Sequence, residues 1–271
     1  MIDAASVTDL ASLKAWFASY CGSFRSADDE VQRNFDLKEL HTRKVCEAAR
    51  LIAQGGGERR LMLAELAAMC HDLGRFPQYQ EFRTFKDSES VNHAHLSARI
   101  LTQSSLLDFL PKGERDSVLI AVRLHNVFQI PSGLPPEAED LLRLVRDADK
   151  LDIWRVFIEY FYAPEHERAS AAGLGFPDLP DCSPDVLAAV GAGNMVQLSM
   201  LKSLHDFKLL QLSWVYDINF LSTLRLVKER GVLEQLAATL PSEKRVVEVL
   251  DRVRSYLELR LAGDRASGAT S

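Results

Sequence analysis

The sequence lacks the features that mark a membrane segment or a disulfide framework. No stretch approaches the roughly 18 consecutive apolar residues that a membrane-spanning helix needs, although 47% of the 271 residues are hydrophobic. Only four cysteines occur, Cys21, Cys46, Cys70 and Cys182, and no two of them form a Cys-x-x-Cys pair. Scattered thiols in apolar helical surroundings behave as small hydrophobic side chains. We therefore expect no disulfides and no membrane partner.

Positive charge is also in short supply. The chain has 32 Lys and Arg against 38 Asp and Glu, a net charge of -6. Because a nucleic-acid surface needs clustered Lys and Arg, we expect no extended surface of that kind. A few local cations still suffice to bind one phosphate group. The first residues, Met1-Ile2-Asp3, are not a basic segment followed by an apolar core, and this predicts a cytoplasmic location.

Alternating apolar and polar residues, the mark of half-buried strands, are not convincingly present. Apolar residues recur instead at intervals of three or four, which predicts an all-α fold. Glycine and proline clusters such as Gly55-Gly56-Gly57 indicate where helices end. We expect helices over residues 6–22, 28–54, 58–73, 92–106, 114–127, 136–162, 184–229 with a break, and 242–262.

The loops suggest how the chain divides. Residues 75–91 form a loop rich in cations and aromatic residues, and residues 163–181 hold several prolines and glycines near a domain boundary. We expect a metal-binding helical domain over 1–165, a C-terminal helical extension packed on it over 166–262, and a disordered tail over 263–271. Apolar stripes on the C-terminal helices would suit either a homodimer interface or an internal core.

Six residues with metal-binding side chains lie on or beside the apolar faces of these helices. At about 100° per residue, each histidine among them projects inward with neighbouring apolar residues. In contrast, His95 and Asp147 are predicted to point outward, and Asp152 is either a rival of Asp149 or its partner. The set of candidate metal ligands is His41, His71, Asp72, His93, His125 and Asp149.

Each candidate has an ordinary explanation when it is considered alone. A buried histidine is more often a hydrogen-bonded core residue than a ligand, and a His-Asp pair is more often a local cap. Six such residues facing one interior favour a shared cause, because an unpaired buried carboxylate is very costly. Imidazole and carboxylate together suit Mn, Fe, Co, Ni or Zn better than Ca. The donors suffice for one octahedral ion or for two ions sharing Asp72, and the chemistry they indicate is hydrolysis.

The order His41, His71-Asp72, Asp149 resembles the HD-domain superfamily of metal-dependent phosphohydrolases. The turn His71-Asp72-Leu73-Gly74-Arg75 is similar to the family's His-Asp-x-Gly-Lys/Arg turn, and Ala148-Asp149-Lys150-Leu151 is similar to its closing segment. The resemblance covers residues 34–160 and implies an HD-type helical bundle with additional C-terminal helices. It further implies that His93 and His125 match the members that hold two metals, and that Arg75 and Lys150 contact phosphate or support a ligand.

The resemblance does not extend to every branch of the family. In the HD-GYP branch a Gly-Tyr-Pro element follows a double histidine, whereas here His125-Asn126 leads to Ser132-Gly133-Leu134-Pro135.

The leading hypothesis is a metal-dependent phosphohydrolase acting on a small phosphorylated substrate such as a nucleotide. Its catalytic residues would be Asp72, Arg75 and Lys150, and its cofactor one or two divalent ions of Mn, Fe, Co, Ni, Zn or Mg. Two alternatives stay open. One is a non-catalytic module that keeps the metal site and senses a nucleotide, and the other is an HD-like di-iron oxygenase.

Overall fold

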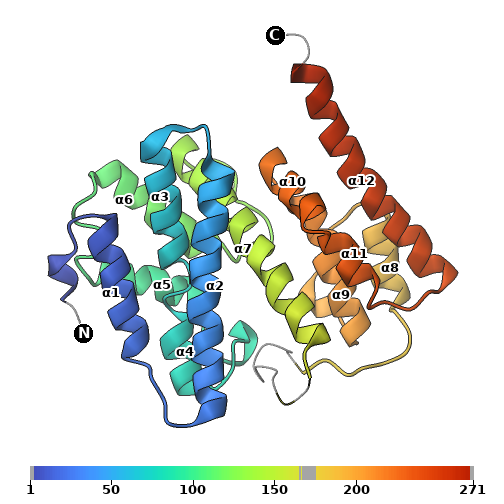
Figure 1. Ribbon diagram of the computed structural model, residues 1–271, viewed down its shortest axis with the longest axis horizontal. Helices are drawn as coiled ribbons and strands as arrows, with labels where there is room; N and C mark the ends of the chain where they lie inside the picture. The colour runs from blue at the N-terminus through green and yellow to red at the C-terminus, as the bar shows by residue number, and fades with distance from the viewer. Residues whose placement is uncertain (1–2, 165, 167–174, 269–271) are drawn as a thin grey trace. The chain divides into compact units, whose positions relative to one another are not determined.

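The computed structural model describes residues 3–164, 166 and 175–268, and every regular element in these ranges is helical (Figure 1). The prediction of an all-α fold is confirmed. Within the same ranges, no helix combines the length and the apolar composition that crossing a bilayer requires.

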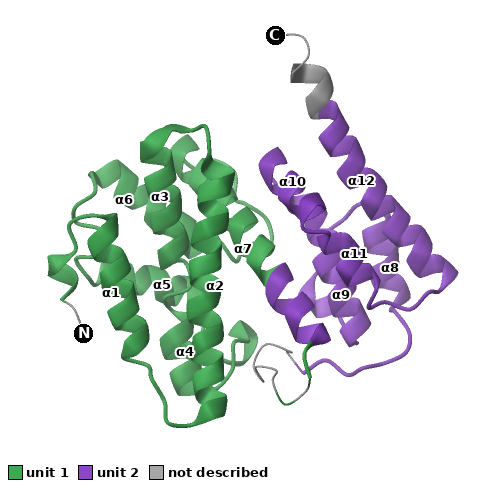
Figure 2. Ribbon diagram, viewed as in Figure 1, with its two compact units in different colours: residues 1–153, 163–174 green, residues 154–162, 175–271 purple. Residues whose placement is uncertain are grey.

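The chain divides into two compact units (Figure 2). Unit 1 comprises residues 1–153 and 163–174, and unit 2 comprises residues 154–162 and 175–271. The border falls inside the long helix α7 (Pro136–Tyr162), whose bounds are those predicted from the sequence. The border expected at residues 165 and 166 lies beyond the end of that helix, and residues 165 and 167–174 are outside the described ranges.

Unit 1 contains the N-terminal helices and the first part of α7. Its elements are η1 (Ala4–Ser6), α1 (Leu10–Gly22), α2 (Asp29–Ala53), α3 (Gly57–Cys70), α4 (Arg75–Phe82), η2 (Asp87–Glu89), α5 (His93–Thr102) and α6 (Lys112–Leu124). The core forms where α2 packs on α3, α3 on α6, and α5 on α6.

Side-chain caps explain where three of these helices begin. Asp9 and Ser12 form a capping box at the start of α1, and the Asp28 carboxylate accepts hydrogen bonds from two backbone amides of α2. The Asn92 side chain accepts from the backbone amide of His95, 3.0 Å away, so that α5 begins at His93. A cap in the sequence thus fixes the position of one of the candidate ligands.

The segment over residues 75–91, predicted to be irregular, includes α4 and η2. That prediction is wrong for α4, because two buried aromatic residues one turn apart, Phe76 and Tyr79, hold this short helix on the core. Two such residues are too few to give a clear helical period. The helix ends at Arg83, whose φ of 56° is left-handed.

An aromatic cluster anchors the turn after α3. The ring of Phe76 lies 6.2 Å from Phe17, 5.6 Å from Tyr20 and 6.2 Å from Phe35, measured between ring centroids. The Tyr20 hydroxyl donates a hydrogen bond to the Leu73 carbonyl oxygen, 3.0 Å away. Aromatic packing of this kind, together with one buried hydrogen bond, holds the turn rigidly against α1 and α2.

Gly74 allows α5 to approach the same turn closely. A Cβ atom at this position would lie 2.3 Å from the His93 carbonyl oxygen and 2.8 Å from the Ser97 backbone nitrogen. The backbone amide of Gly74 instead donates to Ser97 Oγ at 2.8 Å. Only glycine fits, because any side chain would push α5 away from the turn.

Unit 2 consists of the end of α7 and the helices that follow it. They are α8 (Pro184–Gly191), η4 (Leu198–Met200), α9 (Leu204–Ser213), η5 (Trp214–Asp217), α10 (Leu221–Glu229), α11 (Val232–Ala237) and α12 (Lys244–Gly268). The helix predicted over 184–229 is therefore split more often than expected. The sequence predicts a disordered tail over 263–271; α12 continues to Gly268, and residues 269–271 lie outside the described ranges.

A buried carboxylate organises the middle of unit 2. Asp206 is fully buried, and its oxygens accept hydrogen bonds from the Ser183 amide at 2.7 Å, the Ser183 hydroxyl at 2.7 Å and the Lys202 amide at 2.9 Å. Ser203 caps α9 by accepting from the Asp206 amide at 3.1 Å. The carboxylate is thereby satisfied by aligned donors, as a buried polar group should be.

Candidate metal centre

All six candidate ligands meet in the interior of unit 1. His41 comes from α2, His71 and Asp72 from the turn after α3, His93 from the start of α5, His125 from the end of α6 and Asp149 from α7. Their ligand atoms form three overlapping groups in which all atoms lie within 4.8 Å of one another: His41, His71 and Asp72; His71, His125 and Asp149; Asp72, His93 and His125.

Two of the histidines sit at equivalent places, one residue beyond the end of a helix. His71 follows α3, and its Nδ1 atom lies 2.6 Å from the Ala68 carbonyl oxygen. His125 follows α6, and its Nδ1 atom lies 2.8 Å from the Val122 carbonyl oxygen. A carbonyl oxygen only accepts, so in each ring Nδ1 carries the proton and Nε2 faces the cluster.

The other two histidines donate to carboxylates. His41 Nδ1 lies 2.7 Å from Asp152 Oδ2, and His93 Nδ1 lies 2.7 Å from Asp87 Oδ2. Nδ1 is again the protonated nitrogen, and Nε2 again points into the cluster. Metal-ligating histidines usually make this kind of outer contact, which fixes the orientation of the ring.

His93 and His125 present their unprotonated nitrogens to each other. Burial, assisted by the Arg75 charge, lowers the pKa of His93 to about 4, and burial, assisted by His93, lowers the pKa of His125 to about 3. Both rings are therefore neutral near pH 7. Their Nε2 atoms are 3.0 Å apart, so two lone pairs face each other. Such an arrangement is unfavourable unless a cation lies between or beside them.

His41 and His71 also present nitrogen atoms that a bound cation would satisfy. The Nε2 atoms of both rings are buried, and neither has a hydrogen-bond partner. His41 Nε2 lies 3.1 Å from Asp149 Oδ1. Burial and the Lys38 charge act to lower the pKa of His41, but the neighbouring carboxylates of Asp149 and Asp152 outweigh them and raise it. Orphaned nitrogens beside carboxylates are the donors that a first-row divalent ion prefers, so the residues present fit such an ion.

The two oxygens of Asp72 face different histidine pairs. Oδ2 lies 3.6 Å from His41 Nε2 and 3.7 Å from His71 Nε2. Oδ1 lies 3.4 Å from His93 Nε2 and 3.9 Å from His125 Nε2. This is the arrangement expected of a carboxylate shared by two ions.

Two cations balance the Asp72 carboxylate. Lys38 Nζ lies 2.9 Å from Oδ2, and Arg75 Nε lies 3.5 Å from Oδ1. Burial acts to raise the pKa of Asp72, but the nearby charges, of which Lys38 has the largest effect and Arg75 adds to it, hold it well below its usual range. The carboxylate is therefore ionised and available as a ligand. Sequence reasoning did not identify Lys38, although it lies three residues before His41, about one turn away on α2.

The remaining sequence predictions for this region have mixed outcomes. His95 is exposed, as predicted, but Asp147 is completely buried rather than outward-facing, because α7 is covered on more than one side. Asp152 is the partner of His41. Lys150, which follows Asp149 in the sequence, is buried. Arg75 Nη1 donates hydrogen bonds to the Phe85 carbonyl oxygen and to Asp87 Oδ1. Their predicted contacts with phosphate stay predictions.

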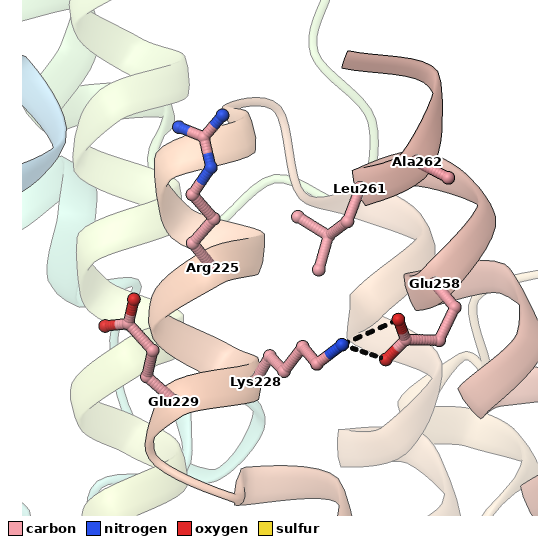
Figure 3. A pocket seen from close by; sticks show the side chains of 6 residues that line it. All are labelled: Arg225, Lys228, Glu229, Glu258, Leu261 and Ala262. Carbon is pink, nitrogen blue, oxygen red and sulfur yellow. Dashed lines mark hydrogen bonds and ion pairs between the residues drawn. The ribbon is translucent and has the colours of Figure 1, made fainter. Parts of the chain in front are cut away.

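Unit 2 presents a different kind of hollow, on its surface between α10 and α12 (Figure 3). Lys228 forms an ion pair with Glu258 across it, at 2.6 Å, and both side chains are half exposed. Exposed ion pairs of this kind contribute little to the stability of the folded state. Among the described residues, the groups with metal-binding geometry all lie in unit 1.

The comparisons with known proteins agree with this geometry. The family model of the HD domain matches residues 40–154, a range that contains all six candidate ligands. The match covers less than half of the chain and says nothing of residues 175–268. Neither the curated proteins nor the solved structures include a significant match.

Proposed function

We propose that this member of the HD-domain superfamily, whose family model matches residues 40–154, is a metal-dependent phosphohydrolase. Its substrate would be a small phosphorylated molecule, and nucleotides are the first class of substrate to test. The observation that carries the proposal is the set of Nε2 atoms around Asp72 and Asp149, which includes orphaned nitrogens and one opposed pair of acceptors. A buried group of this composition is unfavourable without a cation.

The six residues would hold one or two divalent ions, with Asp72 shared if there are two. His41, His71 and Asp149 would serve the Oδ2 side of Asp72, and His93 and His125 the Oδ1 side. When bound, such ions lower the pKa of a coordinated water and neutralise charge on phosphoryl oxygens. Mn, Fe, Co, Ni and Zn suit the imidazole donors, and Mg is the hard-ion alternative.

The chain itself supplies orientation and positive charge. Asp152 holds the His41 ring with its Nε2 atom directed at the cluster. Lys38 lies at the edge of the site with 14% of its side chain exposed, and we propose that it contacts a substrate phosphate. A flexible ammonium beside the metal ligands matches a compact anion and not a long polyanion, in keeping with the net charge of -6.

Metal loading followed by a substrate panel tests the proposal. The purified protein would be stripped, reloaded with Mn²⁺, and assayed against a generic phosphomonoester, a generic phosphodiester and a set of nucleotides. We expect Mn-dependent release of phosphate or of the leaving group. Bound Mn²⁺ without any turnover would favour a nucleotide-sensing module, and iron-dependent oxygen consumption would favour an oxygenase. Either result would refute the proposal.

We propose a cytoplasmic location and a small phosphorylated substrate. The homodimer is a prediction that follows only from the apolar stripes of the C-terminal helices, and sedimentation of the purified chain tests it.

A further inference from the structure

Asp87 is a polar centre that the sequence did not single out. It begins η2, between α4 and α5, and 28% of its side chain is exposed. Its two carboxylate oxygens accept hydrogen bonds from side chains of three surrounding segments. The donors are Arg75 Nη1 at 3.0 Å, Gln78 Nε2 at 3.0 Å, His93 Nδ1 at 2.8 and 2.7 Å, and Asn126 Nδ2 at 3.1 Å.

The contact with His93 determines which nitrogen of that ring faces the site. Both oxygens of Asp87 lie within hydrogen-bond distance of Nδ1, so the proton resides there. Nε2 is then unprotonated and lies 3.0 Å from His125 Nε2 and 3.4 Å from Asp72 Oδ1. Without Asp87, the His93 ring would be free to take the other tautomer or to rotate.

The contact with Asn126 ties the same carboxylate to the second histidine. Asn126 directly follows His125 at the end of α6, and its Nδ2 donates to Asp87 Oδ2. One aspartate therefore holds both the ring of His93 and the residue next to His125. Those are the two histidines on the Oδ1 side of Asp72.

Arg75 links Asp87 to the centre of the site. Its Nη1 atom donates to Asp87 Oδ1, while its Nε atom lies 3.5 Å from Asp72 Oδ1. The same Nη1 also donates to the Phe85 carbonyl oxygen at 2.6 Å. Arg75 thus lies between two carboxylates and holds the segment that carries Asp87, which accounts for this arginine without any phosphate.

We propose that Asp87 is the positioning residue for the metal site formed by Asp72, His93 and His125. The inference rests on the proposed function in that it requires a metal at this position. Carboxylates that accept from the outer nitrogen of a ligating histidine raise its basicity and fix its ring, and their loss weakens metal binding by about 10- to 100-fold. His41, His71 and Asp149 make no direct contact with Asp87 among the described residues, so their side of the site is independent of it.

Equilibrium dialysis of the metal-free protein against Mn²⁺ measures this effect. Wild type is expected to show two classes of Mn²⁺ site. Asp87→Asn keeps the size of the side chain but removes its charge and one acceptor, and it should weaken one class by about 10- to 100-fold while leaving the other unchanged. Asp116→Asn is the matched control, because Asp116 lies in an exposed ion pair with Lys112.

A double-mutant cycle separates positioning of His93 from a general effect on the fold. If Asp87 acts through His93, then Asp87→Asn should change Mn²⁺ affinity less than about threefold in the His93→Ala background. A residue that merely orders the loop would cost the same factor in both backgrounds. That additive result would overturn the inference.

The ring tautomer of His93 gives a readout that needs no metal. Nitrogen NMR of the metal-free wild type should show His93 protonated at Nδ1, and Asp87→Ala should shift the ring towards the Nε2-protonated form. An unchanged tautomer, or equal Mn²⁺ affinities in wild type and Asp87→Asn, would contradict the positioning role of Asp87. The proposed function would not be affected by either result. If wild type binds no Mn²⁺ at all, the proposed function fails as well.

Discussion

Unit 1 and unit 2 each bury an aspartate, and the two surroundings are opposite in character. Asp206 in unit 2 accepts hydrogen bonds from a hydroxyl and two backbone amides, so the donors point at the charge. Asp72 in unit 1 faces four imidazoles whose Nδ1 protons point away from it, with Lys38 as its nearest cation. The first aspartate is satisfied by the protein, whereas the second lies among further electron-rich atoms.

From this difference we propose hydrogen-bond direction as the criterion that separates a structural carboxylate from a metal ligand. Burial does not separate the two, because Asp206 is 0% and Asp72 is 2% exposed. The tautomers of the neighbouring histidines do separate the two aspartates. When each ring donates outward, to a carbonyl oxygen or a second carboxylate, its lone pair is left for a cation.

Replacing Asp72 tests the comparison most severely. Asp72→Ala removes a carboxylate that lies within 3.9 Å of all four histidines, and we expect loss of bound Mn²⁺ and a fall in kcat/KM of at least about 1,000-fold. Helical content measured by circular dichroism should stay close to wild type. Retained activity in this variant would mean that Asp72, like Asp206, is not needed for metal binding, and would contradict the comparison.

Removing the metal should lower the thermal stability of unit 1, and this loss should be the same whether or not Asp206 is present. At a free Mn²⁺ concentration of about 100 times Kd, binding stabilises the native state by about 2.7 kcal/mol. Calorimetry should therefore show a lower Tm after chelation in wild type and in Asp206→Ala, and no such change in Asp72→Ala. A chelator effect that survives in Asp72→Ala would place the metal elsewhere.

Replacing Asp206 should have the complementary outcome. Asp206→Ala leaves the Ser183 and Lys202 amides and the Ser183 hydroxyl without their acceptor, and we expect the free energy of unfolding to fall by about 2 kcal/mol. Mn²⁺ stoichiometry should not change. Asp206→Asn, which keeps one acceptor oxygen, serves as the milder control in the same denaturant titration. A loss of Mn²⁺ in either variant would contradict a purely structural role.

Lys38 should show the smallest effect. Lys38→Gln is expected to raise KM for the phosphorylated substrate by about tenfold, equivalent to about 1.4 kcal/mol, with kcat changed less. Lys112→Gln, at a position where 88% of the side chain is exposed, should leave both constants unchanged. A Lys38→Gln variant with unaltered KM would limit this lysine to pairing with Asp72.

Helical periodicity predicts the main features of unit 1. It places His41, His93, His125 and Asp149 on inward faces because long helices repeat their apolar contacts over several turns. The same reasoning fails for Asp147, since it assumes that α7 is buried on one side, and this residue is completely buried.

Short elements account for what the sequence does not reveal. Asp87 lies in a single turn of 3-10 helix and α4 has only two turns, so neither shows a period that could be recognised. Within the predicted helix over 184–229, Asp206 of α9 accepts hydrogen bonds from Ser183, which lies 23 residues earlier at the start of α8. Contacts between residues distant in sequence cannot be read from local patterns.

Anomalous X-ray scattering from crystals grown with Mn²⁺ tests the central claim most directly. We predict one or two peaks within about 2.3 Å of the Nε2 atoms of the four histidines and of the Asp72 carboxylate. Crystals that bind Mn²⁺ only at other residues, or none at all while these side chains keep their positions, would contradict the account.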